Sequence, residues 1–485
     1  MPAAVELARL DATAQAELVR TGEASVDELA TAAVERIEAL NPTVNAVIHP
    51  LFEEGLAAAG NGLPDGPFRG VPFLLKDIGA SFAGQPLHMG ARALRDADFR
   101  APVDSYLAQR FRAAGLVTLG KTNVPELGLL PTSEPVAFGA TRNPWDLERS
   151  PGGSSGGAAA AVASGMVPVA HANDGAGSIR IPASACGLVG LKPTRQRVTE
   201  GPAIGDVNGG MSCELIVSRS VRDTAAMLDA VHGPAPGDPY AAPPPARPYV
   251  DELDAEPAGL RVGLMSRSLS GIEVAQEVVD AAVGAGELLE ELGHSVEESA
   301  PDGFEDLSLV DTFVTRWEAG AAAGVAMVGA LVGRRLGAGD LEPLTHALAE
   351  RGRQVSAPQY LAAINRHQMM SRLVAGWYES GFDLLLTPTL GEPPPPLGSY
   401  DDTGPDPMVA LERAKLTGAF AGAFNVTGQP AISLPLHWSD EGIPIGVQLV
   451  APFGREDVLI AVAAQLERAR PWAERTPQVF AGRDA

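Results

Sequence analysis

Two serines set in glycine-rich backbone are the residues of this 485-residue chain best suited to chemistry. Ser154 lies in Ser-Pro-Gly-Gly-Ser-Ser-Gly-Gly (150–157), and Ser178 lies in Asn-Asp-Gly-Ala-Gly-Ser-Ile-Arg (173–180). Glycine permits positive φ angles and lets several backbone N–H groups point at one developing anion. A serine beside such a loop is a candidate nucleophile for acyl transfer.

A serine hydroxyl is a weak nucleophile, so another group must accept its proton. Lys76 ends the apolar run Val-Pro-Phe-Leu-Leu-Lys (71–76), which predicts a strand that runs directly into a lysine. Lysine acts as a base only when it is neutral, and burial favours the neutral form. From the residues alone, a strand-end lysine that points to water remains the alternative. We interpret His88 and His171 as structural, because neither lies in a suggestive motif.

Two stretches match the residue patterns of familiar motifs, but the predicted structure around each differs from the one that the motif requires. Residues 115–122 (Gly-Leu-Val-Thr-Leu-Gly-Lys-Thr) fit the P-loop pattern, yet an apolar strand stands where a flexible phosphate-binding loop is needed. Residues 152–156 (Gly-Gly-Ser-Ser-Gly) fit the nucleophile elbow, yet the turn-rich stretch 143–151 precedes them instead of a strand. We therefore interpret both matches as accidental.

Hydrophobic periodicity predicts the elements that must position these residues. Residues 11–23 and 24–41 predict two helices. In the second, Ser25 and Glu28 form a capping box, and the helix should end at Asn41-Pro42. The later predicted elements are a βαβ-like unit (strand 260–265, helix 274–292, strand 294–299), two strands joined by a polar hairpin (424–435 and 442–450) and a closing helix (456–469).

The stretch 149–194 resembles the amidase signature family, serine hydrolases that cleave amide bonds. The spacing of the two serines matches the family pattern, as do Gly-Ser-Ile-Arg-Ile-Pro-Ala-Ser-Ala-Cys-Gly (177–187) and Gly-Val-Pro-Phe-Leu-Leu-Lys-Asp (70–77). The resemblance implies an α/β fold, with a mixed central β-sheet sandwiched by α-helices. It also implies one domain over residues 1–485, with N-terminal helices (about 10–41), a signature core (about 65–230), and a crossover, helical region and C-terminal strands (about 233–475).

The resemblance also implies a Ser-Ser-Lys catalytic triad. Ser178 would be the nucleophile, Ser154 would relay its proton, and Lys76 would receive it. The family holds the residue equivalent to Ser154 after a cis peptide bond, here Gly153–Ser154. Ser155 and Asp174 are expected to support the triad together with Gly153.

The expected oxyanion hole consists of the backbone N–H groups of Gly175, Ala176, Gly177 and Ser178. Family members commonly have glycine where this chain has Ala176. If that position needs a positive φ, alanine adds about 1 kcal/mol of strain. Arg180 is expected to anchor the loop by an ion pair. The candidate substrate-binding residues are Thr132, Arg316 and Trp317.

Composition excludes several classes of partner. The net charge is −24, from 36 basic and 60 acidic residues, so we expect neither nucleic acid nor an acidic membrane as a partner. Two cysteines cannot form a disulfide framework, and no secretory leader or membrane span is recognisable, so we expect a cytoplasmic enzyme. Metal-ligand spacings are lacking, so we expect no metal and no cofactor. Homo-oligomerisation stays open.

Three functions fit the resemblance. The first is an amidase acting on a small or oligomeric amide substrate. The second is an amidotransferase A-type subunit, which would act on glutamine with a partner chain. The third is a catalytically dead scaffold, against which the retained Lys76, Ser154 and Ser178 argue. Within the family, the segments 11–20, 141–150 and 454–467 resemble hydrolases of the cyclic dimer of 6-aminohexanoate, a nylon oligomer, so an amidase of linear or cyclic amides is favoured.

Overall fold

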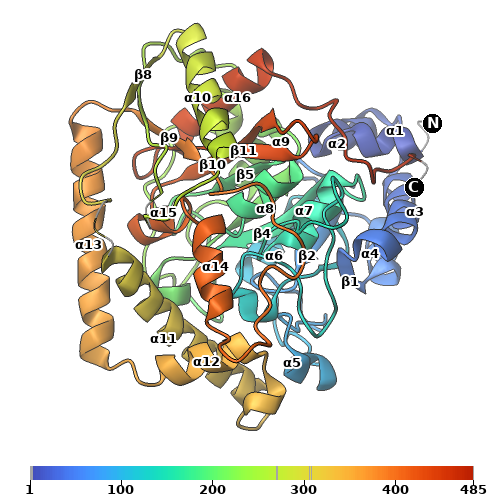
Figure 1. The fold of residues 1–485 in the computed structure, drawn as a ribbon. Coiled ribbons are helices and arrows are strands. Elements are labelled where there is room, and N and C mark those ends of the chain that lie inside the picture. The colour runs from blue at the N-terminus through green and yellow to red at the C-terminus, as the bar shows by residue number, and fades with distance from the viewer. Residues whose placement is uncertain (1–3, 269–270, 305, 307, 484–485) are drawn as a thin grey trace.

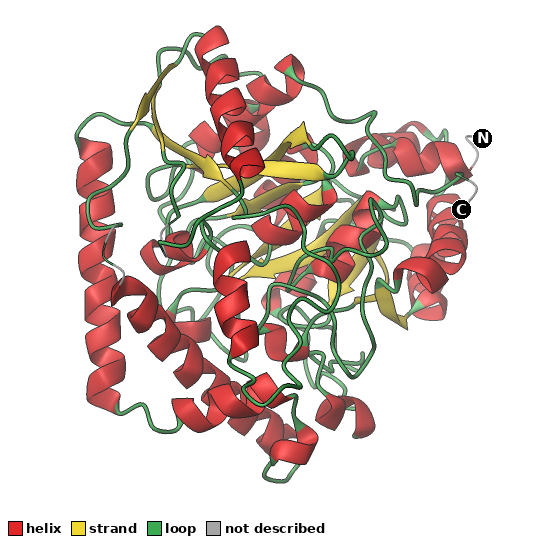
Figure 2. Cartoon of the chain, viewed as in Figure 1, coloured by secondary structure: helices red, strands yellow, loops and turns green. Residues whose placement is uncertain are grey.

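One mixed β-sheet runs through the computed structural model, which describes residues 4–268, 271–304, 306 and 308–483. Within this part of the chain, eleven strands lie in the order β1-β3-β2-β4-β6-β5-β10-β11-β9-β7-β8. Helices cover both faces of the sheet, and the two termini lie on the same side of the molecule (Figures 1 and 2). The predicted α/β fold with a mixed, helix-flanked sheet is therefore confirmed. The one-domain organisation stays a prediction, which the single sheet favours.

The strands and helices have the following bounds. The strands are β1 (Val47–Pro50), β2 (Pro72–Lys76), β3 (Val117–Thr122), β4 (Val169–Asp174), β5 (Val189–Lys192), β6 (Cys213–Ser218), β7 (Arg261–Leu264), β8 (Ser295–Glu298), β9 (Leu384–Pro388), β10 (Ala431–Trp438) and β11 (Pro444–Val450). The helices are α1 (Ala4–Arg9), α2 (Ala12–Thr21), α3 (Val26–Val44), α4 (Phe52–Gly60), α5 (Arg92–Asp96), α6 (Tyr106–Ala113), α7 (Gly156–Ala163), α8 (Arg180–Cys186), α9 (Val221–Val231), α10 (Gln276–Glu291), α11 (Ser308–Leu331), α12 (Pro343–Gly352), α13 (Ala357–Glu379), α14 (Val409–Thr417), α15 (Gly422–Thr427) and α16 (Glu456–Ala469).

Strands β2, β4 and β6 form the part of the sheet that positions the site. Strand β2 is parallel to β3 and β4, whereas β4 is antiparallel to β6. Every residue of β2 is buried, as expected for a strand covered on both faces. Side chains alternate along a strand, so His171 and Asn173 of β4 face one side while Ala172 and Asp174 face the other.

Helix α7 is buried along its entire length, which explains the run of glycine and alanine. At Gly157, a Cβ atom would lie 2.5 Å from the backbone nitrogen of Asn123. Small residues therefore allow α7 to pack directly against neighbouring backbone, immediately after the candidate serine at position 154.

Several predicted elements are confirmed. The capping box of Ser25 and Glu28 is present at the start of α3. Strands β7 and β8 are parallel, as a βαβ unit requires, and α10 lies between them in sequence. Residues 117–122 form β3, which confirms that the P-loop pattern falls on a strand. Helix α16 has the predicted bounds.

Two predicted boundaries are wrong. Helix α3 continues past Asn41-Pro42 to Val44, because Pro42 lacks only its own N–H and the residues after it can still turn. Asn45, at φ 53°, caps the helix by donating its N–H to the Asn41 carbonyl. Residues 424–427, predicted as strand, belong to α15. That helix ends at Gly428, whose left-handed φ of 87° stops it, and β10 begins only at Ala431.

Candidate active site

Lys76 is the last residue of β2, and its side chain is fully buried. Its Nζ atom lies 2.8 Å from Ser154 Oγ and 2.5 Å from Asn173 Oδ1. Burial lowers the pKa of Lys76 to about 7, although the charges of Glu214 and Asp174 oppose this shift. The alternative of a lysine pointing to water is therefore wrong. A large fraction of Lys76 is neutral near pH 7 and can accept a proton.

Ser154 is held by a close approach of two backbone segments. The Gly153–Ser154 peptide bond is cis, as the resemblance implied. A Cβ atom on Gly153 would lie 2.1 Å from the Thr132 carbonyl oxygen, so this position accepts only glycine. On another side, a Cβ atom on Gly128 would lie 3.3 Å from Ser154 Oγ. Ser154 Oγ therefore lies immediately behind Gly128.

The loop from Asp174 to Ser178 is folded around the Asp174 carboxylate. This buried carboxylate accepts the N–H groups of Gly177 at 2.6 Å and Ile179 at 3.2 Å. The Nε and Nη2 atoms of Arg180 donate to the same carboxylate, each at 2.9 Å. Against the effect of burial, the Arg180 guanidinium holds the pKa of Asp174 well below its usual range. The predicted anchoring ion pair of Arg180 is confirmed.

The geometry of this loop changes the expectation for the oxyanion hole. Gly177 has a φ of 125°, whereas Ala176 is not among the residues with positive φ, so the strain considered for Ala176 does not arise. The Gly177 N–H is donated to Asp174 and is not a free donor. Of the four predicted amides, Gly177 is thus engaged by Asp174, and Gly175, Ala176 and Ser178 stay predicted donors.

Ser155 and Asn173 complete the surroundings of the lysine. Ser155 is fully buried, and its Oγ donates to the Asn173 backbone carbonyl at 3.2 Å. The Asn173 side chain lies between Lys76 and Glu214. Neither Asn173 nor Glu214 was predicted as a site residue. Asn173 could have been found from the sequence, because it lies two residues after His171 and therefore on the same face of the predicted strand. Glu214 could not, because its place beside Asn173 depends on how β6 pairs with β4.

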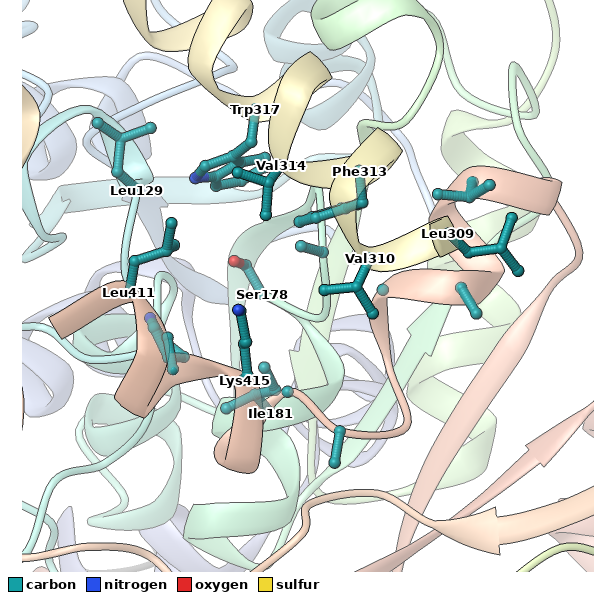
Figure 3. Close-up of a pocket in the computed structure, with 18 of the residues that line it drawn as sticks. Leu129, Ser178, Ile181, Leu309, Val310, Phe313, Val314, Trp317, Leu411 and Lys415 are labelled. Carbon is teal, nitrogen blue, oxygen red and sulfur yellow. The ribbon is translucent and has the colours of Figure 1, made fainter. Parts of the chain in front are cut away.

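A cavity of about 180 Å³ lies against Ser178 (Figure 3). Its wall is mostly apolar, and Ser178 contributes to it from the loop before α8. The lining residues are Gly128, Leu129, Leu130, Pro131, Ala176, Ser178, Ile181, Phe304, Leu309, Val310, Phe313, Val314, Trp317, His367, Met370, Leu411, Ala414, Lys415, Gly418, Ala419, Gly422, Ala423 and Val426. Because Gly128 belongs to this wall, Ser154 lies directly behind the cavity.

The three candidate substrate-binding residues differ in their places. Trp317 lines the cavity, stacked on Phe313. Thr132 is not part of the lining; its hydroxyl lies 2.9 Å from Ser150 Oγ. Arg316 also lies outside the lining, with Nη1 2.7 Å from His367 Nδ1 and Nη2 donating to the Asn208 carbonyl. Protein groups thus engage the Thr132 hydroxyl and both Nη atoms of Arg316, whereas Arg316 Nε is buried without a hydrogen-bond partner among the described residues.

Lys415 of α14 was not predicted. Of the described lining residues it is the one with a permanent charge, and Figure 3 shows its Nζ atom directed toward the side of the cavity where Ser178 lies. The same Nζ donates to both oxygens of Glu412 at 2.7 Å. No motif in the sequence marks this residue, because its position depends on how α14 packs over the loop of Ser178.

A family model named Amidase matches residues 28–460. The chain belongs to the amidase family. It is therefore a hydrolase of carbon–nitrogen bonds other than peptide bonds, and the buried Lys76–Ser154 contact and Ser178 lie inside the matched region.

Known relatives extend over nearly all of the chain. The 6-aminohexanoate-cyclic-dimer hydrolase of Paenarthrobacter ureafaciens is 45% identical over 478 residues, which cover 97% of each chain. A structure of 6-aminohexanoate cyclic dimer hydrolase complexed with substrate has a TM-score of 0.92 and 44% identity, covering 98% of this chain and 99% of that one. The A subunit of the glutamyl-tRNA(Gln) amidotransferase of Thermotoga maritima has a TM-score of 0.78 and 26% identity, with 98% of each chain covered.

Two further observations concern membrane-spanning helices and the cysteines. Among the described residues, no helix combines the length and the apolar character needed to cross a membrane. Cys186 and Cys213 are both free and buried. The cytoplasmic location stays a prediction, and homo-oligomerisation stays open.

Proposed function

We propose that this chain hydrolyses linear or cyclic amide oligomers through an acyl-enzyme on Ser178, with Ser154 as proton relay and Lys76 as base. The observation that carries the proposal is the 2.8 Å contact between Lys76 Nζ and Ser154 Oγ, made by a lysine whose pKa burial lowers to about 7. A buried neutral lysine beside a serine behind the cavity wall has the properties that the first proton transfer requires.

The reaction then has two stages. Ser178 Oγ attacks the amide carbon while its proton passes to Ser154 Oγ, and the Ser154 proton passes to Lys76 Nζ. In this proposal the amides of Gly175, Ala176 and Ser178 stabilise the oxyanion. Return of the proton through Ser154 to the nitrogen releases the amine and leaves the acyl ester on Ser178. Water, deprotonated by the same relay, hydrolyses the ester and regenerates the serine.

The cavity supports an oligomeric substrate with methylene chains. Apolar side chains make up most of its wall, and each methylene group buried there contributes about 0.8 kcal/mol. The relative from Paenarthrobacter ureafaciens is named for the cyclic dimer of 6-aminohexanoate, in which methylene chains separate two amides. Shared identity of 45% over nearly the full length favours the same substrate class here.

The amidotransferase alternative has weaker support. The A subunit from Thermotoga maritima is 26% identical, against 45% for the cyclic-dimer hydrolase. Free glutamine carries an ammonium and a carboxylate on one carbon, so a site for it needs charges of both signs. Lys415 is the permanently charged side chain among the described lining residues, and a predominantly apolar wall would leave the glutamine ammonium unpaired.

The experiment is hydrolysis of the cyclic and linear dimers of 6-aminohexanoate, with glutamine as the control. We expect release of amine from a dimer and none from glutamine. Hydroxylamine should intercept the intermediate as a hydroxamate. Intact-protein mass spectrometry should show the acyl adduct, and peptide mapping should place it on Ser178. Ser178→Ala should abolish turnover while the circular-dichroism spectrum is unchanged. Activity that survives in Ser178→Ala, or an acyl group on Ser154, would refute the mechanism.

A further inference from the structure

A buried carboxylate, Glu214, lies behind the amide that contacts Lys76. Glu214 is on β6 and is paired directly across the sheet with Asn173 of β4. Its Oε1 atom accepts Asn173 Nδ2–H at 3.2 Å, and its Oε2 atom lies 2.6 Å from His171 Nε2. Glu214 is 4% exposed, so water does not replace these partners. The mechanism above gives Glu214 and His171 no part.

The hydrogen bonds of His171 fix its proton and therefore the role of Glu214. The backbone N–H of Lys76 donates to His171 Nδ1 at 3.3 Å. Because Nδ1 must then present a lone pair, the ring proton lies on Nε2 and is donated to Glu214. Glu214 accepts from two N–H donors and behaves as a carboxylate. The ring also ties Glu214 to the backbone of the lysine itself.

Glu214 and the Ile78 carbonyl together decide which way the Asn173 amide faces, because Asn173 Nδ2 donates to both, each at 3.2 Å. A carboxylate oxygen accepts hydrogen bonds, so it selects the Nδ2 side of the amide and leaves Oδ1 facing Lys76 Nζ. A neutral amine has two N–H groups and one lone pair. With one N–H held by Asn173 Oδ1 at 2.5 Å, the lone pair can point at Ser154 Oγ, 2.8 Å away. If the Asn173 amide were rotated, its Nδ2–H groups would face the N–H groups of Lys76, and no hydrogen bond would hold the lysine.

Gly79 makes room for this arrangement. It has a φ of 94°, and a Cβ atom there would lie 2.7 Å from both Asn173 Nδ2 and Glu214 Oε1. The backbone at Gly79 therefore packs directly against the side chains of Asn173 and Glu214 and restricts the movement of both. The packing, the strand pairing and the hydrogen bonds all restrict Asn173 to one orientation.

We propose that Glu214 is a positioning residue for amide hydrolysis: it holds Asn173 with Oδ1 toward Lys76 and so keeps the lysine lone pair directed at Ser154. This inference rests on the proposed function and adds to it the groups that orient the base. Two titratable groups act on the charge of Lys76, namely Glu214 and Asp174. A third, His171, is hydrogen-bonded to Glu214. Burial raises the pKa of Glu200, near Glu214, to about 8, and the Glu214 charge adds to the shift, so Glu200 is uncharged on the acidic side.

The test measures kcat and its pH dependence with hexanoyl p-nitroanilide, an uncharged chromogenic amide, in Glu214→Gln and Asn173→Ala. The glutamine can present N–H to Asn173. This favours a rotated Asn173 amide, against the remaining hydrogen bond to the Ile78 carbonyl, and draws the lysine away from Ser154. We expect kcat to fall about tenfold or more with KM nearly unchanged. The acidic limb of the pH profile, where activity falls as Lys76 gains a proton, should also move to lower pH. The reason is that loss of the Glu214 charge disfavours the ammonium form of Lys76. A purely structural role would not move this limb.

Two further variants make the test decisive. Glu200→Gln is the matched control, a buried carboxyl near Glu214, and it should leave both kcat and the acidic limb unchanged. The double variant Glu214→Gln/Asn173→Ala should be no slower than Asn173→Ala alone, because Glu214 acts through Asn173. Restoring the charge with Glu214→Asp should return the limb toward its wild-type pH.

The results that would overturn the role of Glu214 differ from those that would overturn the amidase mechanism. Wild-type kcat and limb in Glu214→Gln would overturn the proposal, and so would effects that multiply in the double variant. If Glu214→Gln does not fold, wild-type kcat in Asn173→Ala would overturn it. In each case loss of turnover in Ser178→Ala would leave the amidase mechanism intact, whereas survival of turnover there would remove the mechanism as well.

Discussion

The backbone of Thr132 passes so close to Gly153 that a Cβ atom on Gly153 would lie 2.1 Å from the Thr132 carbonyl oxygen. Gly153→Ala must therefore displace the following Ser154 from Lys76. Since a displacement near 1 Å costs about 100-fold in rate, we expect kcat/KM to fall by at least that factor. The measurement is turnover of hexanoyl p-nitroanilide.

A matched glycine elsewhere provides the control for this substitution. Gly284 lies in α10, and a Cβ atom there would meet nothing within 4 Å. Gly284→Ala should leave turnover unchanged and stabilise the helix by roughly 0.5–1 kcal/mol. If Gly153→Ala retained activity within threefold of wild type, the close packing around Ser154 would not matter for the relay.

The pH dependence of turnover should report Lys76. Its pKa of about 7 lies below that of an exposed lysine, and the protonated form cannot accept a proton from Ser154. Activity should therefore be full above this value and fall tenfold for each pH unit below it. Burial lowers the pKa of His88 to about 4, so His88→Gln should leave the limb in place. A limb that moves in His88→Gln would assign the base to histidine instead.

The buried ion pair of Arg180 and Asp174 should be essential for stability. Arg180 also donates to Ala421 O, Gln448 Oε1 and Asn425 Oδ1. Arg180→Met leaves the Asp174 carboxylate buried without its cation, which typically destabilises a protein by about 3–5 kcal/mol. Urea unfolding measures the change. Arg334→Met, which breaks a solvent-exposed pair with Asp340, should have little effect; equal losses in both variants would contradict this view of the loop.

Lys415 should bias the enzyme among charged acyl groups. Three p-nitroanilides of matched length, with hexanoyl, adipoyl and 6-aminohexanoyl groups, end in a methyl, a carboxylate and an ammonium. We expect Lys415→Glu to reverse the preference between the two charged substrates by about tenfold in kcat/KM, which corresponds to ~1.4 kcal/mol. Hexanoyl p-nitroanilide should change little. An unchanged ratio would mean that the acyl chain does not reach α14.

Local patterns predicted much of the fold because they depend on nearby residues. The capping box at Ser25 and the apolar run ending at Lys76 are properties of short segments, and both appear as expected. Pro42 was misleading because a proline disturbs the turn before it, through its missing N–H and its ring, and does not prevent the helical turn after it. Residues 424–427 were misassigned because four residues do not distinguish a helical turn from a strand.

The site was predictable where the family pattern names residues and unpredictable where the fold assembles them. Lys76, Ser154 and Ser178 lie in continuous motifs. By contrast, Glu214 meets Asn173 only through the antiparallel pairing of β6 with β4, and Lys415 reaches the cavity only through the packing of α14. Thr132 and Arg316 lie near the cavity but outside its lining, and protein groups engage the Thr132 hydroxyl and both Nη atoms of Arg316. Such contacts depend on tertiary structure.

The cavity wall is assembled from two separate stretches of sequence. Residues 128–181 supply the wall that carries Ser178, whereas residues 304–426 supply the helices that close over it. Chemistry and recognition are thus inherited on different stretches and can diverge at different rates. Duplicated copies of such a gene could acquire new amide substrates by changes in 304–426 alone. Exchanging lining side chains of that stretch between family members is therefore a route to amidases of altered selectivity, provided that Ala421 and Asn425, which bind Arg180, are kept.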